Sequence, residues 1–149
     1  MLLSYPAIFY FDDEGCPSVP YQVYFPDLDG MTQGESISDA ISMGSEYLGI
    51  SLADDFESKK ELPKPSNINE LSLTKNAPFQ DDEDFDFVFD QEKSFISMVN
   101  VDLTEFLGLD DPIKKTLTIP KWADKLGKEL HLNFSKTLTE AIVREKLEQ

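Results

Sequence analysis

The sequence predicts an α+β protein with two domains, an acidic body over residues 1–111 and a small basic arm over residues 112–149. Three observations lead to this prediction. In the body, short runs of alternating apolar residues precede an apolar stripe at helical spacing, which indicates strands and then a helix. A strand-helix-helix pattern ends the chain. The formal charge also changes sign between the two domains. The arm has 8 Lys and Arg against 5 Asp and Glu, a net charge of +3, whereas the body has a net charge of −19, and the two add up to the −16 of the whole chain.

The first half of the body has the pattern of three strands and a helix. Residues 7–11 and 21–25 are rich in aromatic and β-branched side chains, and turn-forming residues separate them. Residues 31–35 predict a weaker third strand. We expect the helix to begin at Ser36, because Asp39 stands three residues later, as in a capping box. An apolar stripe at helical spacing then follows, formed by Ile37, Ala40, Ile41, Gly44 and Leu48.

The second half of the body is irregular until its final strand. Residues 81–90 alternate Phe85, Phe87 and Phe89 with six carboxylates. This pattern suits either a disordered acidic loop or an edge element with one apolar face, and the alternation favours a partly ordered edge element. Residues 94–102 are almost continuously apolar, as in a strand buried on both faces. The turn-forming residues that follow, Gly108, Asp110, Asp111 and Pro112, predict a hinge before the arm.

The arm is predicted to be a strand and two helices. Residues 115–119 alternate with period two, and Pro120 both ends the strand and suits a first helical turn. Ser135 is the expected cap of the second helix. An arm of this size buries little apolar surface and leaves its strand edge unpaired. Two copies solve both problems when their strands pair and their helices pack together. This is the ribbon-helix-helix arrangement, whose two-stranded ribbon enters the major groove of DNA.

Alternation along the arm's strand assigns a role to each side chain. Lys114, Thr116 and Thr118 share one face and are the candidate base-reading residues. Ser135 and Lys136, at the start of the second helix, are the candidate phosphate contacts. The other face and the helices supply the expected dimer core of Leu117, Ile119, Trp122, Leu126, Phe134, Leu138 and Ile142. The alternative is a strand-helix-helix that only packs against the body, and we favour DNA binding over it.

One stretch of the body resembles a known family. Asp12-Asp13-Glu14-Gly15, the run from Val23 to Gly30, Thr32 with Gly34, and Ala40 together resemble the HicB family of type II antitoxins, with which the arm also agrees. The resemblance covers residues 8–66 and 95–147. After the leucine, Asp29-Gly30-Met31 stands where the family often has Pro or another residue followed by Gly-Cys, and residues 67–90 look like an insertion.

The resemblance implies a partial RNase H-like β-β-β-α-β body without nuclease activity. It also implies an antitoxin that neutralises HicA, a small basic mRNA-cleaving toxin, and represses its own operon by binding operator DNA. The candidate toxin-binding residues are Tyr24, Phe25 and Asp27. The protein is expected to act as a homodimer or a dimer of dimers. A stand-alone ribbon-helix-helix repressor without a toxin is the alternative, and a metal-dependent RNase H-like nuclease is a remote one.

Other classes of function lack support in the sequence. The carboxylates of residues 81–90 are adjacent and would alternate between two faces, so they do not converge on a metal ion. His131 is the only histidine and has no cysteine near it. We therefore expect no catalytic residue, metal or cofactor. Cys16 is the only cysteine, which favours a cytoplasmic protein. No apolar run is long enough to span a membrane.

Overall fold

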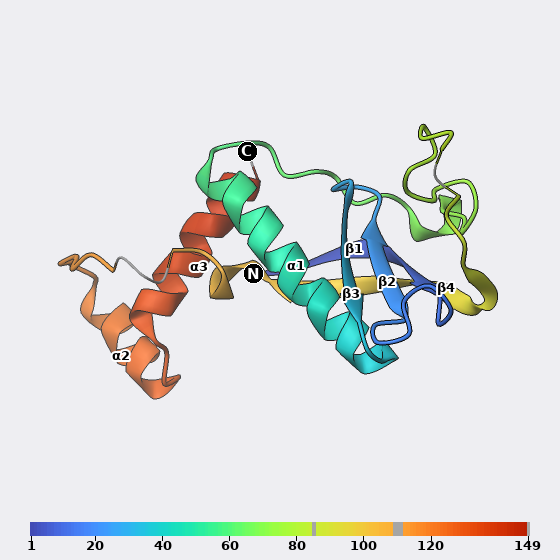
Figure 1. Cartoon of the computed structure of the whole chain (residues 1–149). Helices are drawn as coiled ribbons and strands as arrows, with labels where there is room; N and C mark the ends of the chain where they lie inside the picture. Colours follow the sequence, from blue (N-terminus) through green and yellow to red (C-terminus); the bar gives the residue numbers. More distant parts are fainter. Residues whose placement is uncertain (85, 109–111, 149) are drawn as a thin grey trace. The chain divides into compact units, whose positions relative to one another are not determined.

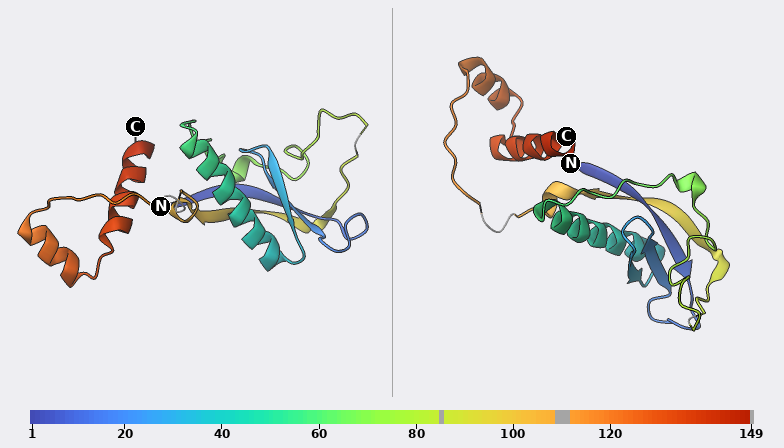
Figure 2. Two further views of the ribbon diagram at one scale, coloured as in Figure 1. Left: turned by 60° about the vertical axis from the view of Figure 1, so that its left-hand side comes forward. Right: turned by 90° about the horizontal axis from the view of Figure 1, so that it is seen from above.

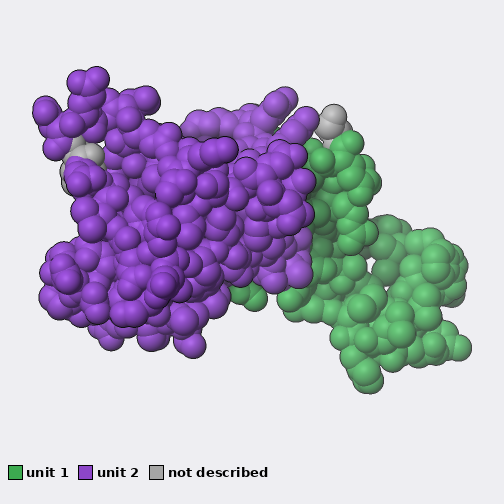
Figure 3. Space-filling view, turned by 90° about the vertical axis from the view of Figure 1, so that its right-hand side faces the viewer, with its two compact units in different colours: residues 1, 104–149 green, residues 2–103 purple. Residues whose placement is uncertain are grey.

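The computed structural model describes residues 1–84, 86–108 and 112–148, and the chain divides into two compact units (Figure 3). One unit is Leu2–Leu103, and the other is Thr104–Gln149 together with Met1. Phe85 and the predicted hinge residues Asp110 and Asp111 lie outside the described residues, as does the end of the predicted body at residue 111.

The first unit is built on a four-stranded antiparallel sheet with the order β3-β2-β1-β4 (Figure 1). The strands are β1 (Leu2–Phe11), β2 (Tyr21–Phe25), β3 (Gly30–Gly34) and β4 (Asp90–Asp102). Ile8 in β1 pairs with Tyr24 in β2 and with Ile96 in β4. The aromatic and β-branched runs therefore form strands as predicted, and β1 and β4 begin earlier than expected.

Helix α1 (Ile37–Glu57) packs on one face of the sheet (Figures 1 and 2). Its cap is the predicted one, since the Ser36 hydroxyl accepts a hydrogen bond from the Asp39 N–H at 3.2 Å. Gly44 lies against Val23 and Phe25, so the helix approaches β2 closely. Ile37 and Ile41, which we expected in the buried stripe, are exposed. The buried stripe consists instead of Ala40, Gly44, Leu48, Gly49, Leu52 and Ala53.

The segment between α1 and β4 covers part of the opposite face of the sheet (Figure 2). Side chains of a strand alternate between faces, so Ile8, Tyr10 and Tyr24 point away from the helix. The Tyr10 hydroxyl donates a hydrogen bond to the carbonyl of Leu73 at 2.8 Å. Other apolar residues of the segment pack against the same cluster, namely Ala77, Phe87 and Phe89. The segment thus acts as a second covering layer.

Two of our expectations for this half of the body are wrong. The described residues between 81 and 89 form turns and irregular chain and do not form the partly ordered edge element that we expected, although Phe87 and Phe89 do face the sheet. Strand β4 is buried only in part, because it is the last strand of the sheet: Val99 and Val101 are buried, whereas Met98 is exposed. A strand at an edge has one neighbouring strand, so fewer side chains cover it.

The second unit contains the two predicted helices, α2 (Lys121–Glu129) and α3 (Phe134–Leu147). Residues 112–120 form neither helix nor strand in the single chain. A strand needs a partner for its backbone hydrogen bonds, so the ribbon stays a prediction about two chains. Our choice of Ser135 as the cap of α3 is wrong. Asn133 is the cap, and its side-chain oxygen accepts the N–H of Lys136 at 3.0 Å.

Candidate functional site

The arm exposes many large apolar side chains in the single chain. The seven residues predicted to form a dimer core are between 37% exposed, for Leu138, and 70% exposed, for Trp122. Gly127 is the buried residue of α2, and a Cβ there would lie 2.5 Å from the Phe134 ring, so the two helices meet closely at this point. Contiguous exposed apolar surface marks interaction sites in soluble proteins. The arm is therefore the first candidate interface.

The predicted DNA contacts lie in the same unit and are exposed. Lys114, Thr116 and Thr118 belong to the irregular residues 112–120, so the single chain does not bring them onto one face. Ser135 and Lys136 lie in the first turn of α3. The Lys136 ammonium group lies 3.9 Å from the Glu140 carboxylate, and the two side chains are 60% and 37% exposed. A pair of this kind is weak and leaves the lysine available to an anion.

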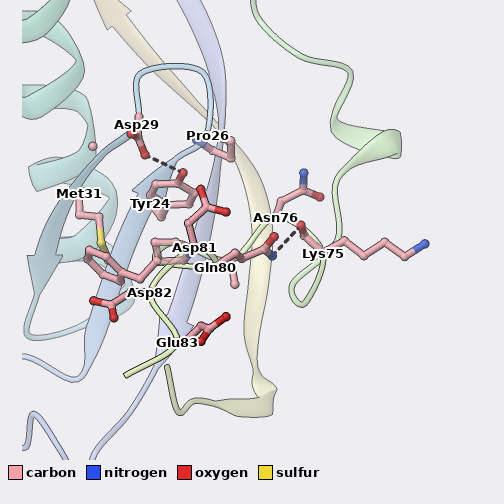
Figure 4. Close-up of a pocket in the computed structure, with 14 residues that line it drawn as sticks. Tyr24, Pro26, Asp29, Met31, Lys75, Asn76, Gln80, Asp81, Asp82 and Glu83 are labelled. Atoms are coloured by element: carbon pink, nitrogen blue, oxygen red, sulfur yellow. Dashed lines mark hydrogen bonds between the residues drawn. The ribbon is translucent and has the colours of Figure 1, made fainter. Parts of the chain in front are cut away.

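The second candidate is a groove in the first unit (Figure 4). It has a volume of about 1120 Å³, is open to solvent, and lies between the turn from β2 to β3 and residues 75–83. The turn and the flanking strand ends contribute the first wall, formed by Tyr24, Pro26, Asp29, Gly30 and Met31. The other wall belongs to the segment that covers this face of the sheet.

The groove is strongly acidic. Asp29, Asp81, Asp82 and Glu83 all line it, and Lys75 is the only cationic residue in the lining. Figure 4 shows the Lys75 side chain extending away from these carboxylates. Within the described part of the chain, none of the four carboxylates has an ion pair with a lysine or arginine. The groove therefore presents negative charge to any partner that enters it.

Tyr24, which lines the groove, is hydrogen-bonded to one of these carboxylates. Its hydroxyl donates a hydrogen bond to Asp29 Oδ1 at 3.1 Å. Burial first, and then the bond to Asp29, raise the pKa of Tyr24 to about 12. The phenol is consequently neutral at physiological pH and holds the Asp29 carboxylate at the edge of the groove.

The three candidate partner-binding residues of the body have different surroundings. Only Tyr24 lines the groove. Phe25 is fully buried, and its ring stacks on that of Tyr47 with the centroids 5.7 Å apart. Asp27 accepts hydrogen bonds from the Ser66 N–H, at 2.9 Å, and from the Ser66 hydroxyl. Phe25 and Asp27 thus fix the turn from β2 to β3, which forms one wall of the groove.

Sequence reasoning did not find the groove. The run of carboxylates from Asp81 to Glu83 was visible, but nothing in the sequence indicated that it would lie opposite Asp29 and Met31. Their closeness in space follows from the packing of Phe87 and Leu73 on Tyr10, and these residues are far apart in the chain.

The described parts of the structure contain no cluster of side chains suited to bind a metal ion. Among residues 1–84, 86–108 and 112–148, no cluster of three or more His, Cys, Asp or Glu is placed to hold a metal ion. His131 takes a left-handed conformation with φ of 52° between α2 and α3. Cys16 is a partly exposed free thiol. The helices described are also too short or too polar to cross a membrane.

Comparison with solved structures gives two informative similarities. A chain of a toxin–antitoxin complex from Streptococcus pneumoniae is 61% identical, and the alignment covers 97% of this chain and 99% of that one with a TM-score of 0.73. The antitoxin HicB of Burkholderia pseudomallei is 24% identical over 94% of this chain and 96% of its own, with a TM-score of 0.51, which supports similarity of fold alone. Comparisons with protein-family profiles and with curated proteins give no match.

Proposed function

From the premise that this chain belongs to the HicB family of antitoxins, we propose that it neutralises a HicA-type, mRNA-cleaving toxin by direct binding. One observation carries the proposal: the chain is 61% identical, along nearly its whole length, to a chain of a toxin–antitoxin complex. The α+β fold, with its four-stranded antiparallel sheet, agrees with the fold of HicB. We take the body to be the partial RNase H-like domain of this family, acting without nuclease activity.

The charge of the body supports a basic toxin as the partner. Residues 1–111 carry a formal charge of −19. A surface of this kind attracts a cationic protein over long range and accelerates its association. A toxin that acts on mRNA must itself bind a polyanion, so its binding surface is cationic and complements the body.

Co-expression tests the neutralisation. The small protein encoded by the adjoining reading frame should arrest growth when it is expressed alone, and co-expression of the full-length chain should restore growth. Affinity purification of the tagged chain should recover the small protein. If growth is not restored and the small protein is not recovered, the proposal is contradicted. That result would favour the alternative, a stand-alone ribbon-helix-helix repressor, for which the exposed apolar arm is equally suited.

We further propose that two arms pair into a ribbon-helix-helix dimer that binds operator DNA and represses the chain's own operon. The exposed apolar side chains between positions 117 and 142 support this pairing, because a second copy would cover them. In the paired ribbon, Thr116 and Thr118 would face base edges, and Lys136 would contact the phosphate backbone. Leu117 would lie between the ribbon and the helices.

Gel-shift titration on DNA from upstream of the operon and on random DNA tests the second proposal. A good base contact contributes about 1–3 kcal/mol of discrimination, so Thr116→Ala and Thr118→Ala should weaken operator binding more than random binding. Lys136→Ala should weaken both about equally and reduce their salt dependence. If both threonine variants bind the operator like the parent, the ribbon does not read bases. Leu117→Ala should instead loosen the dimer.

A further inference from the structure

We propose that the groove between the turn from β2 to β3 and residues 75–83 is where the antitoxin binds a cationic, partly apolar segment of its toxin. The inference rests on the proposed function and identifies the surface of the antitoxin that binds the toxin. It also gives a role to part of residues 67–90, which look like an insertion: residues 75–83 form the second wall of the binding site.

The dimensions of the groove suit a protein segment. Sites for small molecules have volumes of about 300–1,000 Å³ and enclose most of the ligand. This groove exceeds that range at about 1120 Å³ and is open to solvent. An open groove cannot exclude water from a small ligand, whereas a protein partner brings its own surface to close it.

The charge around the groove defines the chemistry of the partner. Asp81, Asp82 and Glu83 are exposed side by side on one wall, and Asp29 stands on the other. These carboxylates have no ion pair within the described residues, so they are available to lysines or arginines of another chain. Charged groups at the rim of an interface mainly set the association rate and its salt dependence.

Apolar side chains in the groove supply a second kind of contact. Phe79 is 52% exposed, and the thioether side chain of Met31 lies on the facing wall (Figure 4). Exposed aromatic and methionine side chains are enriched in protein interfaces, where they act as anchors. Phe79 also takes φ of 60°, a conformation that costs energy for a residue with a side chain. The loop therefore holds this ring half exposed at an energetic cost.

The wall is held in place before any partner arrives. The Gln80 side-chain amide donates hydrogen bonds to the carbonyls of Thr74, at 2.9 Å, and Lys75, at 2.7 Å. The Tyr10 hydroxyl donates to Leu73 and fixes the start of the same loop on the sheet. Such preorganisation lowers the entropy lost on binding. The segment thus has the contacts expected of a rigid binding wall.

Neutralising the acidic wall tests the charge argument in the full-length protein. Asp81→Asn, Asp82→Asn and Glu83→Gln combined remove three charges and keep the side chains nearly isosteric. The matched control combines Glu46→Gln, Asp54→Asn and Glu61→Gln, three exposed carboxylates that do not line the groove. Affinity for the purified toxin is measured at several salt concentrations. The groove variant should bind at least tenfold more weakly with a reduced salt dependence, and the control should bind like the parent.

The outcomes separate the groove from the proposed function. If the parent binds the toxin and the groove variant binds equally well, the groove is not the site, although the function stands. If both triple variants weaken binding to the same extent, only the general charge of the body matters, and the groove is again excluded. Failure of the parent itself to bind toxin overturns the function and the groove together. Operator binding by the groove variant should remain unchanged, because it depends on the arm.

A second pair of variants tests the apolar contact independently of charge. Phe79→Ala should weaken toxin binding at least tenfold, mainly through faster dissociation. Val88→Ala serves as the control, because Val88 is 64% exposed in the same segment and does not line the groove. Equal affinity of the two variants for the toxin would overturn the assignment of Phe79 as an anchor.

Discussion

At the scale of single residues, Gly34 shows how one position of the family motif is fixed by packing. A Cβ on Gly34 would lie 2.4 Å from the backbone nitrogen of Ala40 and 2.5 Å from its Cα. Both atoms belong to the first turn of α1 and cannot move without moving the helix. Gly34 and Ala40 therefore occur together because β3 and α1 meet there without space for a side chain.

Gly34→Ala should consequently destabilise the body. Overpacking of this kind typically costs about 1–3 kcal/mol in the free energy of unfolding. Gly44→Ala is a close comparison, since its Cβ would lie 3.5 Å from Phe25 and Val23, at ordinary contact distance. That change should be neutral or stabilise the protein by up to about 1 kcal/mol, because alanine has the higher helix propensity. Urea unfolding of both variants measures the difference, and equal midpoints would contradict the reading of Gly34.

At the scale of secondary-structure elements, the start of α3 distinguishes two residues that look equivalent in the sequence. Asn133 and Ser135 are both good capping residues, and the sequence analysis expected Ser135 to be the cap. In the structure, Asn133 accepts the N–H of Lys136, and its carbonyl accepts both the N–H and the hydroxyl of Thr137. The helix therefore begins two residues earlier than expected, at Phe134.

Removing each side chain checks this assignment. Asn133→Ala should lower the stability of α3 by about 1 kcal/mol, within the usual range of about 0.5–2 kcal/mol for a lost cap. Ser135→Ala should change it by a few tenths at most, because Ser135 lies inside the helix and caps nothing. Amide hydrogen exchange along residues 134–147 reports both effects. Faster exchange in the Ser135 variant than in the Asn133 variant would show that the cap is misassigned.

The same scale shows what the sequence could predict. Helix α1 and strands β2 and β3 were predictable, because local patterns determine them: a capping pair at Ser36 and Asp39, and alternating or turn-forming residues before it. The groove was not predictable. Its walls come from residues 24–31 and 75–83, and they meet only because Phe87, Phe89 and Leu73 find apolar surface on Tyr10. No period or motif in one sequence encodes a contact of that kind.

The arm's strand lies between these two cases. The alternation of residues 115–119 is a local pattern, but the strand itself needs hydrogen bonds from another chain. The single chain accordingly leaves Leu117 and Ile119 exposed, although their spacing is that of a strand with one apolar face. The local pattern thus identifies candidate ribbon residues, and the proposed ribbon would form only when two chains pair.

At the scale of the whole molecule, we propose that one task belongs to the acidic body, residues 1–111 with a net charge of −19, and another to the basic arm, residues 112–149 with a net charge of +3. Leu2–Leu103 is a compact unit, in which Phe9, Phe25 and Leu48 are fully buried. The second unit carries the exposed apolar residues of the proposed dimer. An acidic body and a basic arm suit a protein that binds a cationic toxin with one unit and DNA with the other.

A chain ending after Leu103 tests this separation. Because Leu2–Leu103 is a compact unit with its own buried residues, it should remain folded and unfold cooperatively in urea. It should sediment as a monomer, since the apolar residues proposed to join two copies are all removed, and it should lose operator binding. Its affinity for the toxin should stay within a few-fold of the parent, because the groove lies wholly in the retained unit.

The controls for this truncation are the full-length chain and its Trp122→Ala variant. The full-length chain should sediment as a dimer or a larger even assembly. Trp122→Ala should shift it toward the monomer at low concentration, because Trp122 is the most exposed of the proposed core residues and has the largest apolar surface to bury. A truncated body that is still dimeric would place the dimer interface in the body. A truncated body that no longer binds toxin would place the toxin contact in the arm. Either of these two results would contradict the proposal that each unit has one task.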